Sequence, residues 1–156
     1  MKDLEQIITS HDLFLGLDPH HLAILASHAK EAEFKAGELL FRQGEPANQC
    51  YFILKGKVSL EAHEPADGTV PVQTLGPGDV LGWSWLFPPF VWNFQARAIE
   101  PTEVIALSGG HLLSSAERDR EFGYELMKRV AQVVIKRLQS TRKQLLERQI
   151  VPALEV

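Results

Sequence analysis

The residue types that carry out catalysis are scattered along this 156-residue chain and form no familiar active-site pattern. A metal-dependent enzyme built on strands needs two or three histidines and a carboxylate on neighbouring strands. The strand-rich part of this chain offers only His63, beside Glu61 and Glu64. No Ser/His/Asp arrangement, H-x-H pair or phosphate-binding P-loop is visible in the sequence. The sequence therefore predicts that the protein is not an enzyme and that it holds no metal ion.

The stretch from Gly82 to Arg97, GWSWLFPPFVWNFQAR, has the residue types of a binding site. It contains six of the thirteen aromatic residues and every tryptophan of the chain, namely Trp83, Trp85 and Trp92. The pair Pro88–Pro89 excludes a helix or a central strand at that point, because proline fixes φ and lacks an N–H. We expect a glycine turn, one helical turn over about residues 83–87, a rigid loop, and a strand over about 92–99. The predicted ligand pocket lies between that helical turn and that strand.

The elements that must position this stretch begin with two N-terminal helices within residues 1–30. Residues 3–9 suggest a short helix, and Asp18 followed by Pro19 is typical of the start of a second helix that runs to about Ala29. Three histidines fall in this second helical region, and we expect them at the surface rather than in a metal site, because adjacent helical residues point in different directions. They are His20, His21 and His28.

Residues 31–107 have the pattern of an antiparallel sandwich or barrel, with short segments of strand formers separated by glycines. Cys50 begins one apolar segment and is expected to be a small buried hydrophobe. Two strands are expected to be joined tightly at Lys55–Gly56, and a hairpin tip at Asp67–Gly68. Strands are predicted near residues 33–34, 39–41, 50–55, 57–63, 70–74, 80–81, 94–99 and 103–107.

After residue 107 the strand pattern ends, and a turn with a short helical piece is expected over residues 108–115. A long helix is then predicted over about 117–149, because nothing breaks the helical pattern from Arg118 to Gln149. Its apolar residues follow alternating steps of four and three, which is the spacing of a coiled-coil seam. The seam residues are Met127, Ala131, Val134, Leu138, Thr141 and Leu145.

A second apolar edge of the same helix, made of Leu126, Val130 and Val133, suits packing on the β body. A helix with two apolar edges is explained most simply by a homodimer, in which one edge faces its own body and the other faces a second copy. Packing on its own domain alone is the alternative. The chain is thus expected to form one domain over residues 1–150, followed by a short tail at 151–156.

The composition narrows the class of protein further. The formal net charge is −4, which argues against a nucleic-acid-binding domain. A single cysteine excludes a disulfide framework, and no segment has the pattern of a membrane span or a signal peptide, so a cytoplasmic location is expected. Residues 118–148 hold nine basic and four acidic residues, so the long helix is a basic arm on an acidic body. We interpret it as a solvated face, with contact to an acidic partner as the alternative.

The order of these elements resembles the cyclic nucleotide-binding domain of the catabolite-activator and fumarate–nitrate regulator superfamily. FKAGELLFRQGEPANQCYFILKGKVSL is similar to the first half of that domain, with its QGEPA-like turn and its Y-x-I-x-x-G strand. LGPGDVLG resembles the approach to its phosphate-binding cassette, and FGYELMKRVAQVVIKRLQSTR resembles its dimerising helix. The resemblance implies an α+β fold: an antiparallel β-roll flanked by short N-terminal helices and a long C-terminal helix.

The resemblance also implies a binding site, from which this sequence departs at two positions. Members that bind cyclic nucleotides place a glutamate after the cassette glycine, for the ribose, and an arginine further on, for the cyclic phosphate. Here Trp83 follows Gly82, and Trp92 matches the arginine position, so the strongest phosphate contact is absent and ordinary cyclic-AMP binding is in doubt. Thr141 matches a threonine that touches the purine in some members. The implied ligand-binding residues are Gly82, Trp83, Ser84, Trp85, Trp92, Asn93 and Thr141.

Two functions remain open at this level. In one, the protein is a regulatory sensor whose tryptophans line a pocket for a nucleotide or another small anionic or aromatic ligand. In the other, the tryptophans fill the former nucleotide cavity, and the protein is a ligand-free dimerisation or protein-interaction module. No helix-turn-helix follows the long helix, so direct sequence-specific DNA binding is not expected, and any output must pass through an unidentified protein partner or the basic helix.

Overall fold

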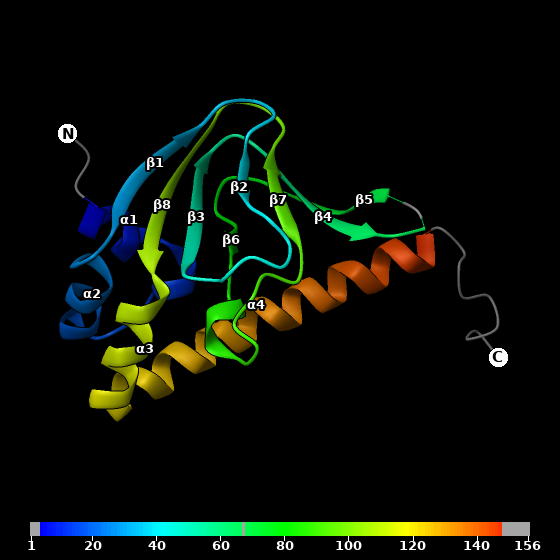
Figure 1. Ribbon diagram of the computed structural model, residues 1–156. Coiled ribbons are helices and arrows are strands. Elements are labelled where there is room, and N and C mark those ends of the chain that lie inside the picture. The colour runs from blue at the N-terminus through cyan, green and yellow to red at the C-terminus, as the bar shows by residue number, and fades with distance from the viewer. Residues whose placement is uncertain (1–3, 67, 148–156) are drawn as a thin grey trace.

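A computed structural model describes residues 4–66 and 68–147, and it has the predicted α+β fold (Figure 1). Two four-stranded antiparallel sheets form a β-roll, with short helices at one end and a long helix running beneath it. The helices are α1 (Leu4–Ser10), η1 (Asp12–Phe14), α2 (Pro19–Ala26), η2 (Ser84–Leu86), α3 (Gly109–Arg118) and α4 (Arg120–Glu147). The strands are β1 (Lys30–Phe34), β2 (Leu39–Phe41), β3 (Gln49–Lys55), β4 (Val58–Glu64), β5 (Gly68–Leu75), β6 (Val80–Leu81), β7 (Gln95–Ala98) and β8 (Thr102–Ser108).

One sheet has the strand order β1-β8-β3-β6, and the other has the order β2-β7-β4-β5. The predicted tight connection at Lys55–Gly56 joins β3 to β4, but these strands belong to different sheets, so the connection is a crossing between sheets and not a hairpin. Gly56 has φ +98°, and a Cβ there would lie 2.5 Å from the carbonyl oxygen of Pro101. Only glycine fits this crossing, since it combines a left-handed backbone with close backbone approach.

β3 explains why the sequence shows a continuous apolar run at this point. Cys50 and Phe52 face a core cluster shared with the helices, whereas Tyr51 and Ile53 face the interior of the roll. Because the strand is buried on both faces, it does not need the alternation of a half-exposed strand. Cys50 is fully buried, as predicted, and this burial raises the pKa of its thiol far above the ordinary value.

Two helical predictions were wrong. Residues 109–118 form a ten-residue helix in place of the expected short piece, and the long helix begins at Arg120 and not at about 117. Asp119 separates the two helices, because its backbone is extended and its carboxylate accepts a hydrogen bond from the Phe122 N–H. The extended backbone at Asp119 therefore ends α3 and its side-chain cap starts α4, although no glycine or proline marks the break. The predicted end of the long helix at 149 lies outside the described residues.

The expected surface position of His21 was also wrong. His21 is 4% exposed, because α2 packs this side chain against Phe122 at the start of α4. Its Nε2 lies 3.6 Å from the carboxylate of Asp119. His20 and His28 are exposed, as predicted.

The long helix α4 has a buried edge and an exposed edge. Leu126 and Val130 belong to the core cluster that includes α1, α2 and α3, so this edge holds α4 on the body. On the other edge, Met127, Val134 and Leu138 are 38%, 53% and 67% exposed. Of the remaining seam residues, Ala131 and Leu145 are exposed and Thr141 is half-buried. Within residues 4–66 and 68–147, no helix is both long and apolar enough to cross a membrane.

Candidate functional site

The cassette region starts at Gly82, which must be a glycine for two reasons. Its φ is +95°, in the left-handed region that side chains avoid. A Cβ at this position would lie 2.7 Å from the carbonyl oxygen of Gln49 and 3.1 Å from the Trp92 ring. The turn thus brings the start of the cassette against β3 and Trp92 at once.

The helical turn after Gly82 is shorter than the sequence predicted. It is a single 3-10 turn, η2 (Ser84–Leu86), whose N-cap Trp83 makes no side-chain capping bond. Trp85 is 4% exposed, and its Nε1 donates a 2.7 Å hydrogen bond to the Gly82 carbonyl. The Trp85 ring lies against Gly109 of α3, where a Cβ would meet it at 2.5 Å. Trp85 therefore holds the turn in the core under α3.

Trp83 is only partly buried as a residue, and it packs beside Trp85 with 5.9 Å between ring centroids. Its Nε1–H is nevertheless buried and has no hydrogen-bond partner within the described part of the chain. An unpaired buried donor costs roughly 1–3 kcal/mol, so this indole is the least satisfied group of the cassette.

Trp92 lies in the opening of the roll. It is 4% exposed, and its ring stacks on Phe41 of β2 with centroids 3.8 Å apart and planes 15° apart. Phe41 in turn stacks on Tyr51 of β3 at 6.1 Å, so the three rings form a column across the interior. Backbone bonds pin Trp92 on both sides, since its N–H donates to the Glu45 carbonyl and its carbonyl accepts from the Gly44 N–H.

The polar residues of the predicted site differ in their exposure. Asn93 is exposed, while Ser84 and Thr141 are half-buried. Arg97 alternates with the buried Ala96 and Ala98 along β7, so its side chain lies on the outer face of the sheet. There it binds Glu61 at 3.3 Å and the Gly37 carbonyl at 2.9 Å. These two contacts therefore hold the Arg97 side chain on the outside of the roll.

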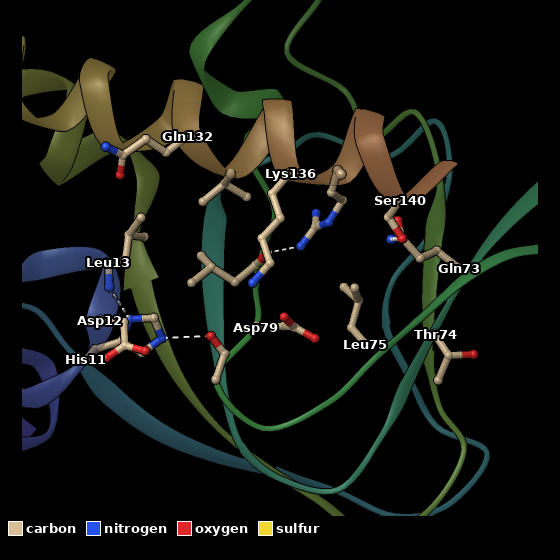
Figure 2. A pocket seen from close by; sticks show the side chains of 14 residues that line it. His11, Asp12, Leu13, Gln73, Thr74, Leu75, Asp79, Gln132, Lys136 and Ser140 are labelled. Carbon is tan, nitrogen blue, oxygen red and sulfur yellow. Dashed lines mark hydrogen bonds between the residues drawn. The ribbon is translucent and has the colours of Figure 1, made fainter. Parts of the chain in front are cut away.

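A second region beside α4 has an open cavity. A groove of about 420 Å³ lies between α4, the β5–β6 turn and η1 (Figure 2). Figure 2 shows the Lys136 side chain reaching from α4 into this groove above Asp79, with Leu75 and Gln73 on the opposite wall. None of the seven predicted ligand-binding residues lines it. We call this cavity the α4 groove.

Charges of both signs face the α4 groove. Arg137 donates a hydrogen bond to the Val80 carbonyl, and burial lowers the pKa of its guanidinium, a shift that the nearby Asp79 carboxylate opposes. One carboxylate oxygen of Asp79 accepts a 2.8 Å hydrogen bond from the Gly76 N–H. Lys136 and Asp12 form no ion pair with any residue in the described ranges. None of the four charged groups around the groove forms an ion pair within the described ranges, and of these groups only Arg137 and Asp79 make side-chain hydrogen bonds there.

The hydrogen bonds of His11 close the η1 end. Its Nδ1 accepts from the Leu13 N–H, so the ring proton lies on Nε2, which donates to the Gly78 carbonyl at 2.9 Å. The ring is thus a neutral tautomer that ties η1 to the β5–β6 turn. On the other side, the Gln73 side chain donates to the Ser140 hydroxyl at 3.0 Å and ties β5 to α4.

Sequence reasoning did not find the α4 groove. Lys136 and Arg137 appeared only as part of a basic helix, and Asp79 only within the LGPGDVLG stretch that leads to the cassette. Residues from three distant segments line the groove, so a search for local motifs has no spacing to detect. No group of three or more histidine, cysteine, aspartate or glutamate residues within 4–66 and 68–147 is placed to hold a metal ion.

Two facing antiparallel sheets, a glycine turn with a short helix in the roll opening, and a long helix beneath them define a β-roll of the cyclic nucleotide-binding type. The family model for the cyclic nucleotide-binding domain matches residues 31–119, more than half of the chain. The chain therefore belongs to the cyclic nucleotide-binding domain family.

Relatives with that domain include a CRP-like cAMP-activated global transcriptional regulator of Mycobacterium tuberculosis. It is 31% identical over 144 residues, which cover 91% of this chain and 62% of the regulator. The chain thus spans less than two thirds of this relative's length. The catabolite activator protein of Thermus thermophilus superimposes with a TM-score of 0.66 at 26% identity, over 85% of this chain and 61% of that one.

A cyclic nucleotide-binding domain from Methylobacillus flagellatus superimposes with a TM-score of 0.78 over 93% of this chain and 82% of that one. At 19% identity this likeness concerns the fold alone. The recognition of the family from the sequence is confirmed by these matches together.

Proposed function

We propose that this chain is a dimeric regulatory domain of its family whose cassette does not bind cyclic AMP in the ordinary way. The observation that carries the proposal is the position of Trp92, whose ring touches the Gly82 turn and stacks on Phe41 inside the roll. In the family's site, the residue at the Trp92 position is the arginine that binds the cyclic phosphate. A buried indole takes up the space in which that phosphate would lie.

The charge of the cassette supports the same proposal. Between Gly82 and Gln95 the chain carries no charged residue, so this segment supplies no guanidinium or ammonium to a phosphate. The next basic residue along the chain, Arg97, is held outside by Glu61 and Gly37. A cyclic phosphate that entered the cassette would lose its hydrogen bonds to water and gain only those to backbone N–H groups of one 3-10 turn. The charge-assisted arginine–phosphate pair, which gives such sites their affinity, would be missing.

The dimer is supported by the exposed edge of α4. The predicted seam residues Met127, Ala131, Val134, Leu138 and Leu145 are all exposed on the single chain, whereas the opposite edge is buried. Ile135 and Leu146, 55% and 46% exposed, widen this apolar strip. An apolar strip of helical spacing on a helix already fixed to its body suits a second copy of itself, in a two-fold arrangement.

A second candidate function is a sensor for another small polar ligand at the cassette. The buried and unpaired Nε1–H of Trp83 favours it, because an acceptor atom on a ligand would satisfy this donor. Such a ligand would have to displace or rearrange the rings of Trp83 and Trp85. Nucleotides test the first candidate, whereas the second predicts that a small polar ligand of another kind perturbs the Trp83 indole N–H.

The experiment is thermal unfolding of the whole chain with cyclic AMP, cyclic GMP and AMP at millimolar concentration. A ligand that binds only the folded state stabilises it by about 2.7 kcal/mol when its concentration is one hundred times its Kd. This stabilisation raises the melting temperature. The proposal predicts no shift with any of these nucleotides. A shift that is specific for the cyclic compounds would contradict it.

A matched pair of variants makes a negative result informative. Trp83→Glu combined with Trp92→Arg restores the two nucleotide-reading residue types, and Trp83→Gln combined with Trp92→Gln removes the same rings without restoring charge. If the rings and the missing charges are what prevents binding, cyclic AMP should stabilise the first double variant and not the second. Stabilisation of neither would place the cause elsewhere in the cassette.

A further inference from the structure

We propose that the α4 groove is a binding site for a small organic anion that has an apolar body, at a place distinct from the cassette. The inference goes beyond the proposed function and does not depend on it, because the groove shares no residue with the cassette. It is carried by the cavity and by the arrangement of charged and apolar side chains around it (Figure 2).

The size and the lining of the groove suit such a ligand. About 420 Å³ lies within the range of small-molecule sites, which extends from roughly 300 to 1,000 Å³. Apolar side chains from three elements face the space, namely Leu13 of η1, Val80 of β6 and Val133 of α4. A ligand with an apolar body would remove these surfaces from water.

The charges select an anion for the α4 wall. Arg137 is held by a hydrogen bond from one of its N–H groups to the Val80 carbonyl, and the nearby Asp79 carboxylate opposes the lowering of its pKa by burial. Lys136 lies beside it on the helix and has no ion pair within the described residues, so its ammonium is the group left to bind an anion. Asp12, at the other end, would accept from a donor on the far side of the ligand.

The groove stays open in the proposed dimer. An α-helix turns 100° per residue, so Lys136 points about 200° away from both Val134 and Leu138, its nearest seam neighbours. The seam and the groove therefore lie on opposite faces of α4. A second copy on the seam would leave the groove accessible.

Occupation of the groove has a direct consequence for α4. The groove's walls are joined by two polar contacts, Arg137 to the Val80 carbonyl and Gln73 to Ser140. An anion held by Lys136 and resting on Val80 would add a third link between α4 and the roll. A ligand in the groove thus favours the state in which α4 is docked on the body.

Amide NMR of the isotope-labelled whole chain tests the site with three probes. Anilinonaphthalene sulfonate carries both an anion and an apolar body, inorganic phosphate carries the anion alone, and phenylnaphthylamine carries the apolar body alone. We expect saturable shifts at Leu13, Gly78 and Lys136 with the first probe only. Shifts confined to the cassette or to the exposed seam of α4, or equal shifts with all three probes, would overturn the proposal.

Two lysine variants supply the charge test. Lys136→Gln should weaken anilinonaphthalene sulfonate binding about fivefold, as expected for one partly solvated ion pair. Lys143→Gln removes the same charge from an exposed position on the same helix, outside the groove, and should leave the affinity unchanged. Equal weakening by both variants would mean that only the overall charge of α4 matters, and it would overturn the assignment to Lys136.

The two proposals fail in different ways. Nucleotide-induced shifts at Trp83 and Trp92 would contradict the proposed function and leave the groove untouched. Absence of binding at Leu13, Gly78 and Lys136 would contradict the groove and leave the cassette argument intact.

Discussion

The cassette and the α4 groove are two candidate binding regions of one small domain, and they differ in whether side chains fill them. The cassette has a glycine turn and a helical turn, but Trp85 and Trp92 are each 4% exposed and pack into the protein. The groove has no recognisable motif, yet it keeps about 420 Å³ open between Lys136 and the β5–β6 turn. The region with the stronger sequence signal thus contains buried tryptophans, and the region with the open groove has no sequence signal.

The difference teaches that packing alone can require a residue of a family's binding motif. Gly82 retains its left-handed backbone because the Gln49 carbonyl and the Trp92 ring crowd it, and this reason holds without any ligand. Lys136, by contrast, contributes nothing visible to packing, since it is exposed and has no ion pair within the described residues. The cassette is thus recognised by a glycine that packing requires, and the α4 groove by a lysine that forms no ion pair within the described residues.

The largest effect is expected from Trp92→Ala, which tests whether the cassette is packed. Removing a buried ring from the column with Phe41 should cost about 3–5 kcal/mol of unfolding free energy, because the lost contacts leave a cavity. Urea denaturation measures this loss. Asn93→Ala, at the exposed neighbour, should change it by less than about 0.5 kcal/mol. A similar small loss at both positions would mean that Trp92 is not part of the core.

A slightly smaller effect is expected from Leu138→Glu on the outer edge of α4. A charge in the apolar seam should weaken the dimer at least about thirtyfold, or roughly 2 kcal/mol, because the seam must bury that carboxylate. Sedimentation analysis over a range of concentrations reports the dissociation constant. Gln132→Glu adds the same charge on the opposite, groove-facing side of α4 and should leave the association unchanged. A dimer that survives Leu138→Glu would place the interface elsewhere.

Gly82→Ala distinguishes the glycine's structural role from a ligand-binding one. We expect about 2 kcal/mol of destabilisation without any nucleotide, because φ is +95° and the added Cβ meets backbone at 2.7 Å. Gly110→Ala, in α3, brings the new Cβ only to ordinary contact with the Ser108 Oγ at 3.9 Å and should be neutral or stabilise by about 0.5 kcal/mol. Differential scanning calorimetry compares the two. A neutral Gly82→Ala would remove the packing explanation for this glycine.

The smallest effect is expected from Asp79→Asn in the groove. The amide oxygen can still accept from Gly76, but the charge that offsets the burial of Arg137 is lost, so about 1 kcal/mol of stability should disappear. Asp12→Asn changes the unpaired carboxylate and should have no measurable effect. Urea denaturation of both variants provides the measurement, and an equal response would mean that Asp79 does not interact with Arg137.

Much of the fold could be predicted from the sequence, because its signals are local. The strands Leu39–Phe41 and Val80–Leu81 and the cap at Asp18 follow from short runs and single turn residues. The break at Asp119 could not be predicted in this way, because a side-chain cap inside a helical pattern looks the same in sequence as an exposed aspartate. The crossing at Gly56 likewise could not be predicted without the strand pairing. A tight hairpin and a connection between two sheets have the same turn residues in the sequence.

The candidate site shows the same limit. The departures at Trp83 and Trp92 could be read from the sequence, but not whether the rings leave a void. That outcome depends on Phe41, which lies about fifty residues before Trp92 in the chain and meets it only through β2. The groove forms where η1, β6 and α4 lie close together in the fold. The spacing of residues in the sequence does not show that these three elements are neighbours.

The indole N–H resonances of the three tryptophans test the central claim most directly, because all three lie in the cassette and none elsewhere. Cyclic AMP would be titrated into the labelled chain to millimolar concentration while the three resonances are followed. If Trp92 occupies the place of the cyclic nucleotide, none of the three resonances should move. A saturable shift of the Trp92 resonance, at a concentration that leaves the α4 groove unaffected, would contradict the account.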